Sequence, residues 1–188
     1  ARIGRLSGEL LIRNTLPLGK GMGSSTAIVV ALARCFLGKN CKLEALAIED
    51  VINVGHSGLD FPSVWEERPL VAEGASYVFI DLPEGLQRGV LVDTGLPSAP
   101  TSIIIGDLKK RLQTEKDLMN SVEMIGNCTE RLLSGEDPLT VFPDHYRGFL
   151  ELGVVPPRVR LLIERIQRSG GAAKPGRFGG ASGGAGMV

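Results

Sequence analysis

The pattern of hydrophobic and polar residues differs between three segments in the first third of the chain. The segment 8–15 contains an apolar run that ends before Pro17, and it is predicted to form a short strand. Residues 24–38 are largely apolar, contain several alanines and end on glycine, which favours a buried helix. Over 42–53 apolar residues recur at helical spacing and predict a second helix. The chain is therefore expected to open with a strand, a glycine loop and two helices.

The remaining segments show the same two kinds of pattern. A polar turn is expected over 55–60. Short β-branched and aromatic runs are typical of strands of one sheet, and they lie at 69–72, 76–81 and 89–93. Four segments of helical character follow, with Gly or Pro between them, at 102–112, 117–134, 138–152 and 157–169.

These elements predict an α+β fold with two lobes. Residues 1–86 are expected to form an N-terminal lobe of sheet and helices. Residues 87–188 are expected to form a C-terminal lobe of helices on a small sheet. The active site is expected between the lobes.

Composition and charge exclude several classes of protein. The 188 residues contain 21 Lys and Arg and 21 Asp and Glu, so no net charge attracts nucleic acid or a membrane surface. The longest apolar run, 27–37, is interrupted by Arg34 and is shorter than the roughly 20 residues that cross a bilayer. Three cysteines without a CxxC pair are typical of buried thiols in a reducing compartment, so a cytoplasmic protein is expected.

The most informative segment lies between the first predicted strand and the first predicted helix. Gly19, Gly21 and Gly23 alternate there, so backbone N–H groups can closely approach an anion. The helix that follows adds its positive N-terminal end, which makes phosphate the expected ligand. The alternative is a turn whose small residues only permit close packing.

Common phosphate-binding motifs do not fit this loop, and a rarer motif does. The sequence contains no GxxxxGK[ST] and no HRD or DFG, and GxGxxG would need a glycine at Ser24. The pattern P-x-x-x-G-[LM]-G-S-S-[TAS] fits from Pro17 to Thr26. It resembles the ATP-binding motif of the superfamily of galactokinase, homoserine kinase, mevalonate kinase and phosphomevalonate kinase (GHMP). The residues expected to bind ATP are Gly19, Gly21, Met22, Gly23, Ser24, Ser25 and Thr26.

Phosphoryl transfer also needs Mg²⁺ and a group that engages the attacking hydroxyl. Ser25 or its neighbour Ser24 offers a hydroxyl, and Glu49 offers a carboxylate oxygen of the kind that Mg²⁺ binds. The resemblance implies the same glutamate, because mevalonate kinases carry a magnesium-binding glutamate eleven residues before their catalytic aspartate, which is the spacing from Glu49 to Asp60. Ser25 and Glu49 are therefore the expected metal ligands.

Residues 57–60 resemble the P-S-G-[IV]-D motif of the superfamily. The resemblance implies that Asp60 accepts the proton of the substrate alcohol and is the catalytic residue. An Asx-type turn is the alternative interpretation. His56 replaces the proline of the motif, and Phe61 replaces the asparagine that usually follows it. His56 either touches the substrate or lies in a solvent-facing loop.

Three further segments are similar to parts of the superfamily, and the first two of them resemble mevalonate kinases in particular. Residues 91–101 resemble a strand followed by T-x-x-P-x-x-T. Residues 144–154 resemble an N-x-x-L-x-x-L-G-V helix end, with His145 expected on the helix surface. The glycine-rich segment 170–188 resembles the third motif, which closes over the phosphates; Lys174 fits it and the next residues do not. The first motif of the superfamily normally precedes the glycine loop. Either residues 5–9 are a remnant of it, or the part of the N-terminal lobe that carries it and the first strands is expected to be absent from this sequence.

The resemblance implies an ATP- and Mg²⁺-dependent kinase that phosphorylates the alcohol of mevalonate, in isoprenoid precursor synthesis. A kinase of another small alcohol (threonine, homoserine, phosphomevalonate or a sugar) is the alternative within the superfamily. A non-catalytic member that binds a nucleotide or metabolite is the alternative outside enzymes. The expected partner is a small-molecule alcohol, with no nucleic acid or membrane, and a homodimer is left open.

Overall fold

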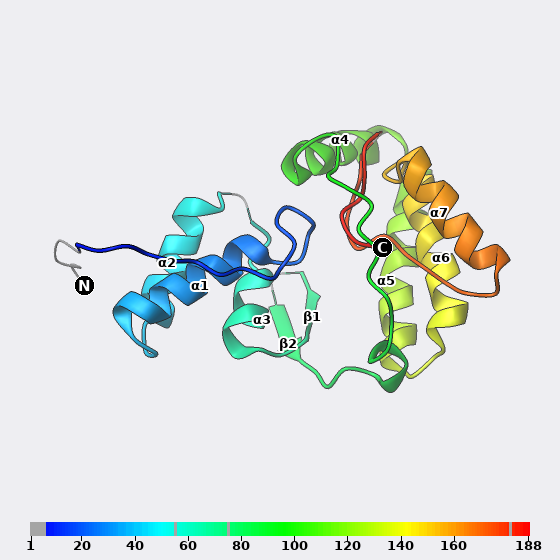
Figure 1. The fold of residues 1–188 in the computed structure, drawn as a ribbon. Helices are drawn as coiled ribbons and strands as arrows, with labels where there is room; N and C mark the ends of the chain where they lie inside the picture. Colours follow the sequence, from blue (N-terminus) through cyan, green and yellow to red (C-terminus); the bar gives the residue numbers. More distant parts are fainter. Residues whose placement is uncertain (1–6, 55, 75, 181) are drawn as a thin grey trace. The chain divides into compact units, whose positions relative to one another are not determined.

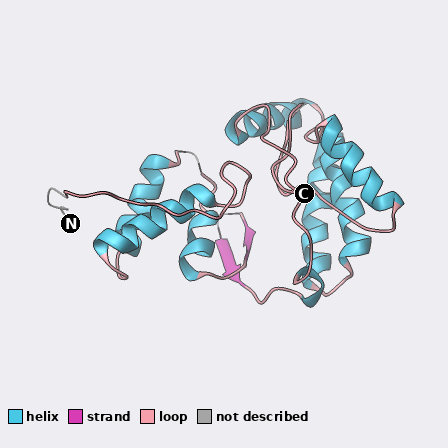
Figure 2. Cartoon of the chain, viewed as in Figure 1, coloured by secondary structure: helices cyan, strands magenta, loops and turns pink. Residues whose placement is uncertain are grey.

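The computed structural model describes residues 7–54, 56–74, 76–180 and 182–188 (Figure 1). The chain divides into two compact units, Ala1–Asp81 and Leu82–Val188, which we call unit 1 and unit 2. Both are rich in helix, and the strands form a small antiparallel sheet in unit 1 (Figure 2). The fold is therefore α+β, as the sequence predicts. The ATP-binding role expected of the N-terminal lobe stays a prediction.

Unit 1 combines three helices with one β-hairpin. The helices are α1 (Ser24–Leu37), α2 (Lys42–Ile52) and α3 (Asp60–Glu66), and the strands are β1 (Leu70–Glu73) and β2 (Ser76–Phe79). The strands pair antiparallel, with Leu70 opposite Phe79 and Glu73 opposite Ser76. The helices predicted over 24–38 and 42–53 and the strands predicted over 69–72 and 76–81 are thus confirmed.

The core of unit 1 explains helix α3, which the sequence pattern did not predict. Phe61 and Trp65 lie one turn apart on α3 and stack with ring centroids 5.8 Å apart. They pack with buried residues of α1 and the start of α2, among them Val30 and Ala45. Arg34 covers the outer face, with its guanidinium 4.4 Å from the centre of the Trp65 ring. The spacing of Phe61 and Trp65 was the available signal for α3.

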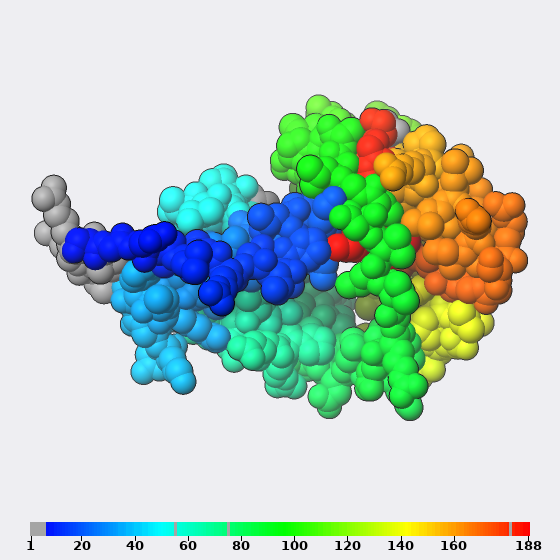
Figure 3. All heavy atoms as spheres, viewed as in Figure 1, coloured from blue at the N-terminus to red at the C-terminus, as the bar shows by residue number. Residues whose placement is uncertain are grey.

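The strand predicted over 8–15 is wrong. The described part of this segment has no regular structure and runs over the surface of unit 1, where Figure 3 shows it in dark blue. Its apolar side chains are exposed, with Leu11 71% accessible. A strand needs a neighbour for its N–H and C=O groups, and none of the described strands pairs with this segment.

Unit 2 consists mainly of helices. They are α4 (Thr101–Thr114), α5 (Asp117–Leu133), α6 (Pro138–Glu151) and α7 (Pro157–Arg168), preceded by the short 3₁₀ helix η1 (Glu84–Leu86). All four helices predicted in this half are confirmed. Buried Ile104, Leu152 and Val154 belong to one core cluster, and Val159 and Ile163 of α7 belong to a second. None of the helices in the described part of the chain is long and apolar enough to cross a membrane.

The third predicted strand, at 89–93, does not join the sheet of unit 1. Instead, Val92 exchanges two backbone hydrogen bonds with Val188, at 2.8 and 3.0 Å, and Thr94 N–H donates to Gly186 at 2.8 Å. This short ladder replaces the small sheet expected in the C-terminal lobe, because no strand longer than an isolated bridge forms among the described residues of unit 2. Gly184 lies against it so closely that a Cβ would come within 2.4 Å of the Thr94 carbonyl oxygen.

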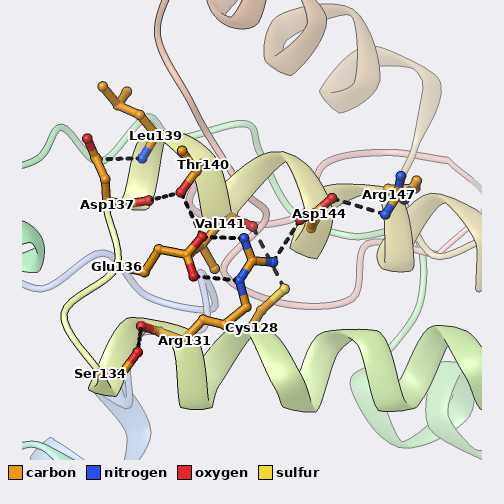
Figure 4. Close-up of polar contacts among 10 residues, drawn as sticks. All are labelled: Cys128, Arg131, Ser134, Glu136, Asp137, Leu139, Thr140, Val141, Asp144 and Arg147. Carbon is orange, nitrogen blue, oxygen red and sulfur yellow. Dashed lines mark hydrogen bonds and ion pairs between the residues drawn. The ribbon is translucent and has the colours of Figure 1, made fainter.

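An ion-pair network joins α5 to α6 (Figure 4). Arg131 donates to Glu136 at 2.8 and 2.5 Å and to Asp144 at 2.7 Å, and Arg147 donates to the other oxygen of Asp144 at 3.0 Å. Hydrogen bonds from Arg131 hold the pKa of Glu136 at about 2. The network ties the turn after α5 to the first half of α6.

Two single residues differ from their predicted environment. Cys41 and Cys128 are buried thiols, but Cys35 is exposed because it lies on the outer face of α1. His145 is not a surface histidine: its ring stacks on Phe149 with centroids 4.6 Å apart, and its Nδ1 is buried without a hydrogen-bond partner among the described residues. Burial, and secondarily the charge of Lys174, lowers the pKa of His145 to about 3.

The lowered pKa of His145 predicts a specific pH dependence of stability. Between its ordinary pKa of about 6.5 and about 3, the unfolded state binds more protons at this residue than the folded state. The free energy of unfolding should therefore fall as the pH falls through this range, by up to about 1.4 kcal/mol per pH unit from this group. His145→Phe keeps a stacked ring, removes the titration and should flatten the profile between about pH 6.5 and 5.

Urea unfolding followed by circular dichroism at a series of pH values measures this effect. Glu136 does not interfere above about pH 5, because the titration of a carboxyl group lies lower. An equal pH dependence in His145→Phe and the parent protein would show that His145 does not carry it.

Candidate active site

The glycine loop before α1 has the backbone that its alternating glycines predict. Gly19, Gly21 and Gly23 have φ angles of 70°, 77° and 61°, all in the left-handed region. The Gly23 carbonyl accepts the Ala27 N–H at 2.9 Å and so begins the helix. No side chain in the described part of the chain caps α1, so the amides of its first turn are left for another acceptor.

The three hydroxyl residues after Gly23 occupy different environments. Ser24 and Thr26 are buried, whereas Ser25 is exposed. Thr26 Oγ1 donates a hydrogen bond of 2.6 Å to Glu49 Oε1, and Ser25 Oγ donates one of 2.7 Å to Asn53 Oδ1. Ser25 and Glu49, the two metal ligands expected from the sequence, thus have different hydrogen-bond partners, and Glu49 contacts Thr26. Their role as metal ligands stays a prediction. Met22, the remaining predicted loop residue, is partly buried.

The geometry of α1 and α2 accounts for these pairs. Glu49 and Asn53 lie one helical turn apart and share one face of their helix. Ser25 and Thr26 are adjacent in α1, so their side chains diverge by about 100° and reach different turns of α2. The spacing of apolar residues over 42–53 predicts that Glu49 lies on a helix. The packing of α1 against α2 determines which hydroxyl forms a hydrogen bond with it.

Glu49 has the features of a cation ligand. Its side chain is 1% exposed, and its Oε2 is buried with no hydrogen-bond partner among the described residues. A buried carboxylate oxygen without a partner is costly, and a cation would relieve that cost. No group of three or more His, Cys, Asp and Glu able to hold a metal lies in the described part of the chain. The unpartnered oxygen of Glu49 is compatible with Mg²⁺, which binds proteins through one or two carboxylates and takes other ligands from phosphates and water.

Asp60 lies beside the glycine loop. It is the first residue of α3, and its Cγ lies 3.8 Å from the position that a Cβ on Gly23 would occupy. Its side chain is exposed, in contrast to that of Glu49. The structure therefore brings the predicted catalytic aspartate to the predicted phosphate loop, within one compact unit.

His56 positions the turn that leads to Asp60, a role that the sequence left open. The Gly58 N–H donates to His56 Nδ1 at 3.0 Å, so the ring proton lies on Nε2, which donates to Asp50 at 2.9 Å. The imidazole thereby joins the last turn of α2 to the turn before α3. Of residues 57–60, Ser57 also accepts the Leu59 N–H at 3.3 Å, as in the turn interpretation.

Comparison with known families gives a match over the part of the chain that contains these residues. Residues 1–64 match the family model "GHMP kinases N terminal domain", a range that contains the glycine loop, Glu49 and Asp60. The match supports the GHMP superfamily, and it suggests a kinase of that superfamily. No curated protein and no solved structure gave a match.

The Thr26–Glu49 hydrogen bond predicts a measurable cost of its removal. Thr26→Val keeps the shape of the side chain but leaves both oxygens of Glu49 without a partner. We expect the free energy of unfolding to fall by about 1–3 kcal/mol. Urea unfolding measures the change.

Ser25→Ala is the matched control, because Ser25 makes a similar hydrogen bond at an exposed position. It should change the free energy of unfolding by about 0.5 kcal/mol or less. Equal losses in the two variants would contradict a special cost of the buried carboxylate.

Proposed function

We propose that the protein is a small-molecule kinase that transfers the γ-phosphoryl group of ATP to an alcohol, with mevalonate as the preferred substrate. One observation carries the kinase part of the proposal: a glycine loop at the start of α1, a buried carboxylate with an unpartnered oxygen, and an exposed aspartate lie together in unit 1. Mevalonate is proposed from the resemblance of residues 91–101 and 144–154 to mevalonate kinases. These are the parts that phosphoryl transfer requires, namely a phosphate cradle, a metal ligand and a group for the attacking hydroxyl.

The residues of the loop and of α1 bind and orient the phosphates in this proposal. Backbone N–H groups along Gly19–Thr26 and the N-terminal end of α1 attract the negative charge. Bound Mg-ATP supplies the phosphoryl group and neutralises the charge between its phosphates. Ser25 and Glu49 hold the metal: Ser25 Oγ donates its proton to Asn53, which leaves its lone pairs for a cation, and Glu49 offers Oε2.

Asp60 acts on the substrate alcohol in this proposal. Its exposed carboxylate accepts the hydroxyl proton while the oxygen attacks, and its place beside Gly23 sets that oxygen against the phosphates. Thr26 and His56 act as positioning residues, because the first orients Glu49 and the second fixes the turn before Asp60.

Asp60→Asn tests the catalytic assignment. The amide has nearly the same shape but cannot accept the proton, so turnover should fall by at least about 100-fold. Nucleotide affinity, measured by calorimetry, should stay within about twofold, because Asp60 acts only at the alcohol. Retained turnover with an unchanged fold would refute the role of Asp60.

The substrate is tested by ADP release over a panel of mevalonate, phosphomevalonate, threonine, homoserine and galactose. The proposal requires mevalonate to give the highest kcat/KM. A higher value for another alcohol would keep the kinase and correct the substrate. Nucleotide binding without turnover on any alcohol would favour a non-catalytic protein.

Gly23→Val tests the phosphate loop. Gly23 has a φ of 61° and a ψ of 20°, a left-handed conformation that a β-branched residue adopts only with strain. The valine should therefore distort the start of α1 and abolish Mg-ATP binding in calorimetry. Gly38→Val is the matched control, because Gly38 also has a positive φ, 86°, but lies at the other end of α1. The loop would be only a packing turn if Gly23→Val bound Mg-ATP as tightly as the parent.

A further inference from the structure

Unit 2 contains a large cavity whose lining is mainly apolar. Its volume is about 930 Å³, and it lies between the segments 85–92 and 172–176, the start of α6 and the end of α7. Phe142, Ile166 and Met187 are among its apolar lining residues. The volume falls in the range of sites for small organic ligands, about 300–1,000 Å³. All residues that line the cavity belong to unit 2.

Lys174 lines this cavity and lacks an acidic partner. Its Nζ makes one weak hydrogen bond, 3.4 Å to the carbonyl of the adjacent Pro175, and lies 5.9 Å from the centre of the Phe142 ring. No Asp or Glu of the described residues forms an ion pair with it. Burial lowers the pKa of the Lys174 ammonium, as expected for a cation held against apolar groups.

The other charged side chains of the cavity indicate the charge of a suitable ligand. Arg88 and Asp137 complete the charged lining, so with Lys174 the side chains carry one net positive charge. Asp137 is already engaged, because its carboxylate accepts the Leu139 N–H at 2.9 Å as the cap of α6. The positive side chains of Arg88 and Lys174 therefore favour a ligand with a negative head group.

The apolar part of the lining indicates the body of that ligand. Val90, Leu91 and Leu139 line the cavity and are 83%, 65% and 55% exposed, so they leave apolar surface in contact with water. An aliphatic chain would cover this surface at a gain of about 25 cal/mol per Å². The charged head group and the aliphatic chain of such a ligand would thus contact different residues of the cavity.

We propose that this cavity binds a small carboxylate with an aliphatic chain, whose head group pairs with Lys174 and whose chain covers the exposed apolar lining formed by Val90, Leu91 and Leu139. The site uses no residue of the proposed kinase site in unit 1 and does not depend on kinase activity. It assigns Lys174 a role in ligand binding, whereas the third-motif resemblance implies only that the segment 170–188 closes over the phosphates.

Calorimetry with octanoate tests the proposal. Acetate, which has the carboxylate but no long chain, and octanol, which has the chain but no charge, test the two parts of the ligand separately. Octanoate should bind at one site per chain, and acetate and octanol should each bind at least about tenfold more weakly. Lys174→Met should weaken octanoate about tenfold or more and leave octanol unchanged, whereas Lys174→Arg should retain octanoate binding. The control Lys109→Met removes a lysine from the exposed face of α4 and should change nothing.

Further measurements on Lys174→Met distinguish the loss of a ligand-binding group from misfolding and from a role of Lys174 in Mg-ATP binding. Lys174→Met should raise the melting temperature of the ligand-free protein, because it removes an unpaired cation from apolar surroundings; a folded, stabilised variant excludes misfolding as the cause of lost binding. Its Mg-ATP affinity should be unchanged. The proposal is overturned if octanoate does not bind, if it binds Lys174→Met as tightly as the parent, or if that variant loses Mg-ATP instead.

Discussion

The buried hydrogen bond between Thr26 and Glu49 is the contact on which the candidate active site depends. It fixes α1 against α2 in one register, because a threonine in the first turn of α1 meets a glutamate near the end of α2. That register places the glycine loop at the same end of unit 1 as the turn that α2 leads into. A carboxylate is a costly residue to bury at such a position, so the contact stabilises one arrangement and leaves one oxygen that requires a further partner.

The second half of the site follows from the apolar face of α3. Phe61 and Trp65 pack against α1 and α2, and this packing holds the start of α3, where Asp60 is the first residue. Asp60 is exposed and Phe61, the next residue, is buried. The candidate catalytic carboxylate and a core side chain therefore lie in the same turn of α3. The imidazole of His56 limits the movement of the intervening turn.

Much of the fold could be predicted from the sequence, because its helices have clear periodicity and end at Gly or Pro. The helices of unit 2 and the hairpin of unit 1 belong to this group. The segments 8–15 and 89–93 were mispredicted because a strand depends on its neighbour, and β-branched or apolar composition does not specify one. In the site, motif spacing located Glu49 and Asp60, but only the pairing of α1 with α2 shows that Thr26 contacts Glu49.

The ladder between Val92 and Val188 has a consequence for how the protein folds during synthesis. The hydroxyl of Thr94 bonds to a carbonyl 92 residues further along the chain, so a long loop must close before this part of unit 2 is complete. Contacts of such separation form slowly, whereas the Thr26–Glu49 bond spans only 23 residues. At a translation rate of about 5–20 residues per second, unit 1 can fold for several seconds before the final residues of unit 2 leave the ribosome. Until then, the apolar side chains beside the ladder remain open to chaperones and to other nascent chains.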